Sequence, residues 1–363
     1  MDVFLVAGQS NSVGQGDYTL SPKVPDGQVF QYYNGVISTG TDPLGNANTG
    51  SAWPSLGLEY NRISGKKICF VPSAVDGSSV VYANNTTANW DVDGTLFGIG
   101  VANVTAAMNA LTNAGHNPVF KGVLWVLGET DASNPTNHRT CLQACIARFR
   151  QIYGATMPFY ISTVGFTGGT DSTAFQTVRG DQEYIAANDP YTHIMFRDAW
   201  SFPARGFMNS DNVHYNQTAL NQLGIIAARN ILGAARPSRS MLRFHSSGSI
   251  SANASTYLGS DYFGGVESLM ATPLPYYGTI MNLYSKTSTA PTSGQSAVYT
   301  IEKNGSDTGI TCTTSGTNIS SNDVSHNSNF NAGDTITVKL VTSITAATAW
   351  HGVSCEIRPI EQV

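Results

Sequence analysis

The sequence is short of charge: Asp, Glu, Lys and Arg make up 12% of its 363 residues, about half the usual share. The formal net charge is −5, and Lys and Arg form no basic patch. We therefore expect neither nucleic acid nor an anionic lipid surface as a partner. No apolar run approaches the roughly 18–20 residues of a membrane-spanning helix, so we also expect no membrane insertion.

Cysteine is scarce as well, with five residues: Cys69, Cys141, Cys145, Cys312 and Cys355. No C-x-x-C pair occurs, which argues against a zinc site. Cys141 and Cys145 lie four apart on an expected helix and are typical of small buried apolar residues. Cys312 and Cys355 could pair across a C-terminal sheet, which the sequence alone does not decide. We predict neither a metal ion nor an organic cofactor.

A segment typical of a signal peptide is also missing from the beginning of the sequence. Gly, Ser, Thr and Asn are abundant instead, a balance that suits extracellular β-rich surfaces. We expect an extracellular or virion-associated protein. Either it is exported or assembled by another route, or further residues precede Met1.

The first stretch of the chain combines a buried strand with a polar turn. The apolar run Val3 to Ala7 is long enough for a strand buried on both faces, and Gly8 ends it. Gln9, Ser10 and Asn11 then stand at the carboxyl end of that strand, where open α/β sheets bind ligands. Ser10 is therefore a candidate nucleophile, although a serine there often only caps the next helix.

Strands and helices alternate up to residue 236. This order predicts an α/β domain over residues 1–236, with a parallel sheet flanked by helices on both faces. After the first strand, we expect strands at 67–72, 121–127, 158–164 and 193–196, and helices at 56–63, 98–114, 138–153, 173–187 and 217–232.

Residues 14–57 interrupt this order with Gly, Pro and aromatic side chains, which indicates long loops with short strands. Loops of this length often form the wall of a substrate cleft. Packing of the aromatic rings against the edge of the sheet is an equally good interpretation. The aromatic residues are Tyr18, Phe30, Tyr32, Tyr33 and Trp53.

Residues 237–363 show a different pattern, with the two-residue alternation of strands in runs such as 297–301 and 335–340. Asn304-Gly305, Ser315-Gly316 and Gly333-Asp334 provide the turns between them. This pattern predicts a small all-β sandwich or jelly roll, with the domain boundary within a few residues of Pro237.

Polar, Gly-containing turns also follow two later strands of the α/β domain. Gly77 lies after the second strand, and Gly128-Glu129-Thr130-Asp131 lies after the third. Asp211 precedes His214 by three residues, ahead of the last helix. An Asp at that spacing can fix the tautomer of the imidazole, whose other nitrogen then faces a serine.

Together, Gly8-Gln9-Ser10-Asn11, Gly77, Gly128-Glu129 and Asp211-x-x-His214 resemble the SGNH hydrolase superfamily, and more narrowly its sialate O-acetylesterase-type carbohydrate esterases. The resemblance covers roughly residues 1–235 and implies a flavodoxin-like α/β sheet. It implies Ser10 as nucleophile, His214 as general base and acid, and Asp211 as the group that orients His214. The backbone N–H groups of Ser10 and Gly77 would line the oxyanion hole, with Gln9 and Glu129 as further oxyanion or substrate-binding residues.

One departure from the family pattern concerns the third block, usually Gln-Gly-Glu, which here reads Leu127-Gly128-Glu129. If the absent glutamine donates to the oxyanion, its loss is worth roughly 3 kcal/mol. Thr130 could donate instead. Glu129 could steady the His214 side of the site, or could be a structural acceptor that holds adjacent loops together.

The remaining histidines have no partner motif, and we interpret them as surface or packing residues: His116, His138, His193, His245, His326 and His351. In the C-terminal part, Tyr257-Leu258-Gly259, residues 272–275 and Lys303-Asn304-Gly305 resemble β-sandwich modules of phage tail fibres and tailspikes. This second resemblance implies a virion-associated enzyme and makes a homotrimer a possible assembly. Its aromatic residues could bind sugars, pack between subunits, or be buried in the core: Tyr262, Phe263, Tyr276 and Tyr277.

The sequence therefore predicts a serine esterase that removes acetyl groups from a carbohydrate or polysaccharide. A catalytically weak or inactive glycan-binding or tail-structural protein on an esterase fold is the alternative, motivated by Leu127.

Overall fold

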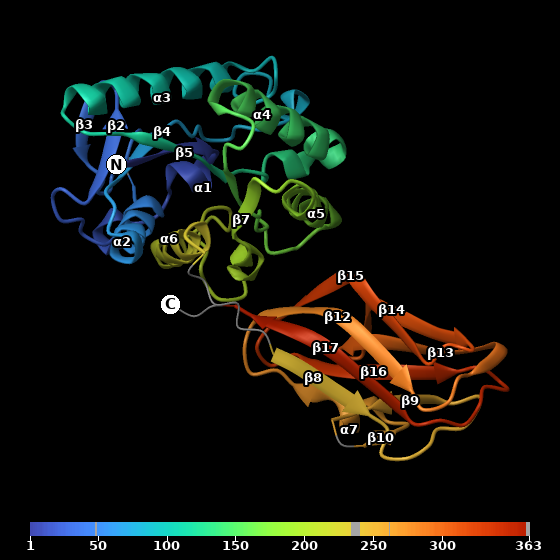
Figure 1. The fold of residues 1–363 in the computed structure, drawn as a ribbon. Helices are drawn as coiled ribbons and strands as arrows, with labels where there is room; N and C mark the ends of the chain where they lie inside the picture. The colour runs from blue at the N-terminus through green and yellow to red at the C-terminus, as the bar shows by residue number, and fades with distance from the viewer. Residues whose placement is uncertain (48, 234–239, 261, 361–363) are drawn as a thin grey trace. The chain divides into compact units, whose positions relative to one another are not determined.

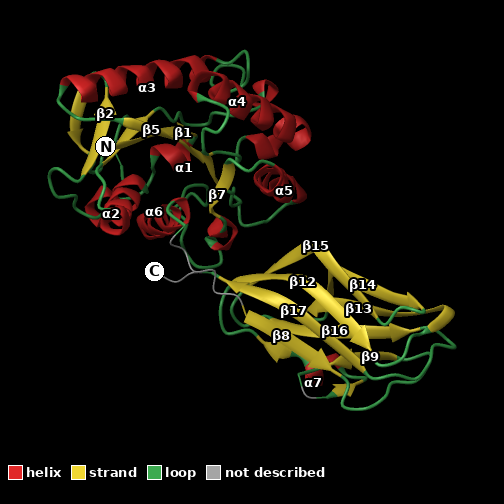
Figure 2. Cartoon of the chain, in the orientation of Figure 1, coloured by secondary structure: helices red, strands yellow, loops and turns green. Residues whose placement is uncertain are grey.

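In the computed structural model, which describes residues 1–47, 49–233, 240–260 and 262–360, strands and helices alternate along the first part of the chain (Figure 1). The chain divides into two units, Met1–Ala235 and Arg236–Gln362. The predicted boundary at Pro237 lies outside the described residues. Figure 2 shows helices and strands mixed in the first unit and a second unit made almost wholly of strands.

The first unit is built on a seven-stranded sheet of order β3-β2-β4-β1-β5-β6-β7. All neighbours are parallel except β2 and β3. The expected parallel sheet thus has one antiparallel strand, β3, at its edge. The strands are β1 Asp2–Gly8, β2 Val29–Tyr33, β3 Val36–Thr39, β4 Ile68–Pro72, β5 Val119–Val126, β6 Phe159–Ser162 and β7 Thr192–Phe196.

Helices cover both faces of this sheet, as the alternation along β1 requires. Phe4 and Val6 share one core with α2 and α6, whereas Val3 and Leu5 share the other with α3, α4 and α5. The helices are α1 Ser10–Val13, α2 Trp53–Ser64, α3 Thr95–Asn113, α4 His138–Tyr153, α5 Thr173–Asn188 and α6 Gln217–Ile231. The predicted α/β fold class is confirmed.

Helix α3 bears on the expectation that the chain does not insert into a membrane. By length and composition alone it could cross a membrane, and 33% of its most apolar window is buried. Its inner face, with Leu96, Val104 and Leu111, is buried in the core that contains Val3 and Leu5. Polar residues such as Asn103, Thr105 and Asn109 interrupt the apolar positions of this helix, so the sequence shows no long uninterrupted apolar run here.

The second unit consists of two antiparallel sheets that enclose one core. One sheet has the order β10-β9-β16-β13-β14 with β11 on β16, and the other has the order β15-β12-β17-β8. The alternation of the strands turns Tyr299, Val338 and Leu340 of the first sheet and Ile280 and Ile357 of the second into this core. The elements are β8 Ser240–His245, β9 Ser255–Leu258, β10 Phe263–Gly264, α7 Glu267–Met270, β11 Thr272–Pro273, β12 Gly278–Thr287, β13 Thr292–Lys303, β14 Ser306–Gly316, β15 Ser320–Phe330, β16 Thr335–Thr342 and β17 His351–Pro359.

The turn between β13 and β14 shows why the hairpin prediction succeeded. Asn304 and Gly305 have φ values of 51° and 76°, which is the left-handed backbone that a two-residue hairpin turn of this type needs. The cysteines are free thiols, so Cys312 and Cys355 do not form the disulfide that the sequence left open. Both are buried in the core of this unit.

Candidate active site

Ser10 is held in place by the sharp turn that ends β1. Gly8 has a φ of +136°, and a Cβ atom there would lie 2.1 Å from the carbonyl oxygen of Val126 on β5. Only glycine therefore fits between the two strands at this point. Ser10 follows at the start of α1 and is 7% exposed, at the carboxyl edge of the sheet where the sequence placed it.

Asp211 and His214 approach Ser10 from the loop before α6. His214 Nε2 lies 3.0 Å from Ser10 Oγ, and His214 Nδ1 lies 2.7 Å from Asp211 Oδ2. The carboxylate can only accept, so Nδ1 carries the proton and Nε2 is the acceptor that faces the hydroxyl. The structure thus brings Ser10 together with a pair of residues that lies about 200 positions away in sequence.

Asp211 is itself held by the backbone of its own loop. Its Oδ1 accepts hydrogen bonds from the N–H groups of Val213, at 2.8 Å, and His214, at 3.0 Å. Burial opposes the charge of this carboxyl, but the hydrogen bonds from His214 and Val213 outweigh it and hold the pKa of Asp211 at about 2. The group that orients the imidazole is therefore a carboxylate throughout the physiological range.

A second set of contacts fixes the His214 loop against the Ser10 turn. Asn11 Oδ1 accepts from the N–H of Tyr215 at 3.0 Å, and Asn11 Nδ2 donates to Glu129 Oε1 at 2.8 Å. The hydroxyl of Tyr215 lies 3.2 Å from the same oxygen of Glu129. Burial raises the pKa of Glu129, and the hydrogen bond from Asn11 opposes the rise.

Glu129 therefore matches the acceptor interpretation, because it holds adjacent loops together. It steadies the His214 side through Asn11 and Tyr215. The sequence contained Asn11 and Glu129 in its motifs but gave no signal for Tyr215, whose contacts arise from the fold.

Gln9 has a defined orientation in the site. Its Oε1 accepts from the N–H groups of Gly128, at 3.3 Å, and Thr130, at 3.2 Å. The Nε2 end has no hydrogen-bond partner in the described part of the chain. Gln9 thus presents an amide donor beside Ser10, whereas the side chain of Leu127 is buried in the core that contains Val3 and Leu5.

Gly77 lies on the loop after β4, and Asp131 anchors that loop. The buried carboxylate of Asp131 accepts from the N–H groups of Val80, at 2.9 Å, and Val81, at 3.1 Å. Burial raises the pKa of Asp131. Thr130 Oγ1 donates to the carbonyl of Gly77 at 3.2 Å, so its hydroxyl is engaged with this loop and is not a spare oxyanion donor.

These side chains surround a cavity of about 490 Å³, which we call the Ser10 cleft. Of the described residues in the segment 14–57, Gln15 alone lines this cavity, so none of the five aromatic residues named in that segment forms its wall. Trp53 is buried in the core instead, with its indole N–H donating to the carbonyl of Ser12 at 2.7 Å. The lining residues are Gln9, Ser10, Gln15, Asp76, Gly77, Glu129, Thr130, Thr167, Val213 and His214.

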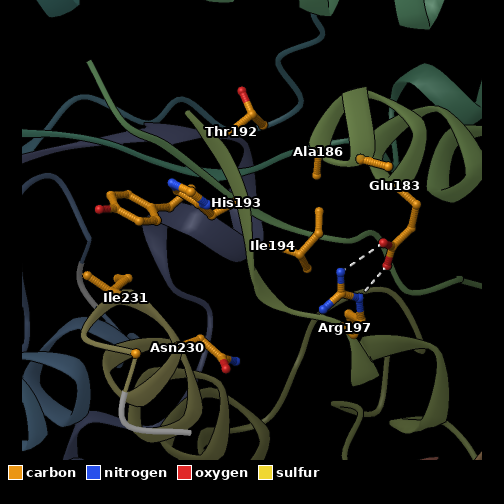
Figure 3. A pocket seen from close by; sticks show the side chains of 11 residues that line it. Glu183, Ala186, Thr192, His193, Ile194, Arg197, Asn230 and Ile231 are labelled. Carbon is orange, nitrogen blue, oxygen red and sulfur yellow. Dashed lines mark hydrogen bonds and ion pairs between the residues drawn. The ribbon is translucent and has the colours of Figure 1, made fainter. Parts of the chain in front are cut away.

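A second cavity of about 460 Å³ lies beside β7, with residues of α5 and α6 in its wall (Figure 3). The ion pair between Glu183 and Arg197, at 2.7 Å, stands on one side of it. Neither serine nor cysteine lines this cavity within the described residues, so it offers no comparable nucleophile. In the same described ranges, no group of three or more His, Cys, Asp and Glu side chains could hold a metal ion.

The other histidines show that the D-x-x-H spacing alone does not identify a catalytic site. Asp323 and His326 repeat the D-x-x-H spacing in the second unit, with His326 Nδ1 2.9 Å from Asp323 Oδ2, but this imidazole is largely exposed. His351 is buried beside Tyr299, whose hydroxyl lies 2.8 Å from its Nδ1. His138 is also buried, 3.3 Å from Asp181.

Among solved structures, a protein from Arabidopsis thaliana is similar with a TM-score of 0.50 at 17% identity, over 64% of this chain and 98% of that one. A carbohydrate acetylesterase from Xanthomonas citri gives 0.47 at 15%, over 96% of this chain and 80% of its own. A tail fiber protein from an E. coli phage gives 0.38 at 13%, over 97% of this chain and 46% of its own. At these identities the likeness concerns the fold alone. No curated protein matches the chain.

Residues 1–233 match the family model described as "Carbohydrate esterase, sialic acid-specific acetylesterase". The match spans the sheet, its helices and every residue of the Ser10 cleft. It supports an ester hydrolase acting on acetylated carbohydrate. The chain belongs to the sialic acid-specific acetylesterase family of carbohydrate esterases.

Proposed function

We propose that the protein is a serine O-acetylesterase that releases acetate from an acetylated polysaccharide. The single observation that carries this proposal is the aligned series from Asp211 through His214 to Ser10, with separations of 2.7 and 3.0 Å. This is the arrangement that activates a hydroxyl for attack on an ester.

In the first half of the reaction, Ser10 Oγ attacks the acetyl carbonyl carbon while its proton passes to His214 Nε2. The negative charge moves to the carbonyl oxygen. When the tetrahedral intermediate collapses, the bond to the sugar oxygen breaks and that oxygen takes the proton from His214. In the second half, water attacks the acetyl-serine in the same way and acetate leaves.

The oxyanion needs donors, and we assign three to it: the backbone N–H groups of Ser10 and Gly77 and the side-chain amide of Gln9. The geometry at Gln9 supports this role, since two backbone N–H groups hold its oxygen and leave its Nε2 unpaired. Gln9 thereby supplies an amide donor although position 127 is a leucine, whose side chain is buried in the core. This weakens the alternative of an inactive glycan-binding protein, which rested on Leu127.

The test is acetate release from a panel of acetylated polysaccharides and from an aryl acetate. We expect Ser10→Ala, Asp211→Ala and His214→Ala each to lower kcat by about three to six powers of ten. Unchanged rates in Ser10→Ala would exclude the serine mechanism. Glycan binding without acetate release by the unaltered protein would favour the binding-module alternative.

We further propose that the second unit serves to present the esterase to a surface glycan, on a virion or outside the cell, in a homotrimer. Exposed aromatic side chains on that unit, Tyr262, Tyr284 and Trp350, support contact with sugars or a neighbouring subunit. Phe263, Tyr276 and Tyr277 are partly buried. Sedimentation equilibrium would test the trimer, and a monomer at micromolar concentration would contradict it.

A further inference from the structure

The Ser10 cleft is distinctive in its charge. Its lining includes the exposed carboxylate of Asp76 and, among the described residues, neither Lys nor Arg. Glu129 also lines the cleft, but its carboxyl is held by Asn11 and Tyr215 and burial raises its pKa, so we count only Asp76 as a lining charge. Asp211 adds a further carboxylate directly behind His214. Proteins bind carboxylates mainly through Arg or Lys, above all through the paired N–H groups of Arg.

The neighbouring arginine is already engaged. Arg179 donates to both oxygens of Asp171 and, at 3.0 Å, to the carbonyl of Gly165, and its side chain is 12% exposed. It is thus neutralised and turned toward its own loop. A substrate carboxylate in the cleft would meet negative charge without a compensating cation.

We infer that the cleft selects O-acetylated sugars that carry no carboxylate near the acetyl group, and that Asp76 with Gln15 sets this selectivity. The inference rests on the proposed esterase function and names its substrate class. It departs from what the family description, sialic acid-specific, would suggest, because every sialic acid carries a carboxylate on its sugar ring.

Asp76 and Gln15 form a structured pair at the cleft. Gln15 Nε2 donates to Asp76 Oδ1 at 3.2 Å, and the carbonyl of Gln15 accepts from Asn209 Nδ2 at 2.7 Å. The N–H of Asn209 in turn donates to the carbonyl of His214 at 2.8 Å. The pair is therefore tied to the loop that carries the catalytic base.

The free end of the pair has the chemistry for sugar hydroxyls. Asp76 Oδ2 has no hydrogen-bond partner within the described residues, and Asp76 is exposed beside Gly77. A carboxylate oxygen accepts hydrogen bonds and cannot donate them. Sugar hydroxyls can donate hydrogen bonds to Oδ2 of Asp76, whereas the charge of Asp76 would repel a carboxylate on the substrate.

The experiment compares two substrates that differ only in charge. One is the methyl glycoside of mono-O-acetylated N-acetylneuraminic acid, and the other is the same compound with its carboxylate converted to a carboxamide. We expect kcat/KM for acetate release to be about tenfold higher for the carboxamide at low salt. The ratio should fall toward one at 1 M salt, where the Debye length is about 3 Å.

Two variants localise the effect. Asp76→Asn keeps the acceptor for Gln15 but removes the charge, and should reduce the substrate ratio to about twofold or less. Asp93→Asn removes an exposed carboxylate from the turn before α3, away from the cleft lining, and should leave the ratio unchanged. Equal changes in both variants would overturn the role of Asp76.

The outcomes also separate this inference from the proposed function. If Ser10-dependent hydrolysis of an aryl acetate is intact and the carboxylate substrate is preferred, the selectivity inference is wrong and the esterase stands. If the protein releases acetate from neither sugar nor from the aryl ester, both are wrong.

Discussion

Ser10, Asp211 and His214 could be identified from sequence because each belongs to a pattern at a recognisable place: a strand end or the start of a helix. The D-x-x-H motif alone could not show that His214 contacts Ser10. Asp323 and His326 adopt the same local geometry, yet no serine hydroxyl meets His326 Nε2 among the described residues. The chemistry depends on the sheet, which places β1 and the loop before α6 at one edge.

Other residues of the site were missed or only partly understood. Asn11 was noticed only as part of a motif, and Gln15 and Tyr215 were not noticed as site residues. Their partners are dozens to hundreds of positions away: Asn11 contacts Tyr215, and Gln15 contacts Asp76. Such pairs leave no periodic signal, since only the folded chain brings them together.

The first residue-level prediction concerns the amide of Gln9. Replacement by Leu keeps much of the volume but removes the donor, and we expect kcat on an aryl acetate to fall about 10²- to 10³-fold with a smaller change in KM. Gln143→Leu, a change on α4 remote from the cleft, is the control and should leave kcat unchanged. A Gln9→Leu enzyme with full kcat would show that the oxyanion uses other donors.

At the level of elements, periodicity located the strands and helices of the first unit to within a few residues. The hairpin of β2 and β3 was expected only as short strands without bounds in the segment 14–57, although Asn34 and Gly35 have positive φ values typical of its turn. Short strands between long loops lack the repeated alternation of apolar and polar residues that identifies a strand in a sequence. The pairing register between β12 and β15 shifts at a bulge in β15 near Asp323. The sequence did not predict this bulge, because it interrupts the alternation of the strand.

Asp131 provides a prediction about the loop after β4. Asp131→Asn retains one acceptor but places a donor against the N–H groups of Val80 and Val81. We expect kcat to fall about tenfold or more with KM little changed, because the N–H of Gly77 loses its position. Asp131→Glu should not restore kcat, because its longer side chain does not fit the buried site. An unchanged kcat in Asp131→Asn, with the fold intact by circular dichroism, would contradict this.

His351 on β17 makes the free energy of unfolding of the second unit depend on pH. Burial lowers the pKa of His351 to about 4, so the folded chain binds fewer protons than the unfolded chain between about pH 6.5 and 4. Stability from this residue is complete above the unfolded pKa and falls as pH drops through that window, by about 2–3 kcal/mol in total. Denaturant unfolding of the second unit at pH 7 and pH 4 measures it, with His351→Gln as the variant in which the decline should shrink. An equal decline in His351→Gln would assign the effect to other groups.

At the scale of the whole molecule, chemistry and the proposed presentation to a glycan belong to different units. All residues of the Ser10 cleft come from the first unit, and each unit has its own core. Composition and the change of period near residue 237 predicted this organisation. They could not predict free thiols for Cys312 and Cys355, since that depends on where the two side chains lie in the sandwich.

A shortened chain of residues 1–233 tests this division of roles. We expect its kcat on an aryl acetate to stay within about twofold of the full chain, because the hydrogen bonds that join Ser10, His214 and Asp211 lie within the first unit. Its rate on an intact acetylated polysaccharide should drop if the second unit binds glycan. Loss of aryl acetate hydrolysis by a folded 1–233 chain would show that the second unit completes the site.

The most direct measurement of the central claim is the site of covalent capture by a fluorophosphonate, read by peptide mass spectrometry. The account predicts one adduct on Ser10 in the unaltered protein and equally in His326→Ala, and none on Ser10 at matched times in His214→Ala. An adduct on another residue with loss of esterase activity, or full labelling of Ser10 in His214→Ala, would contradict the nucleophile and base assigned here.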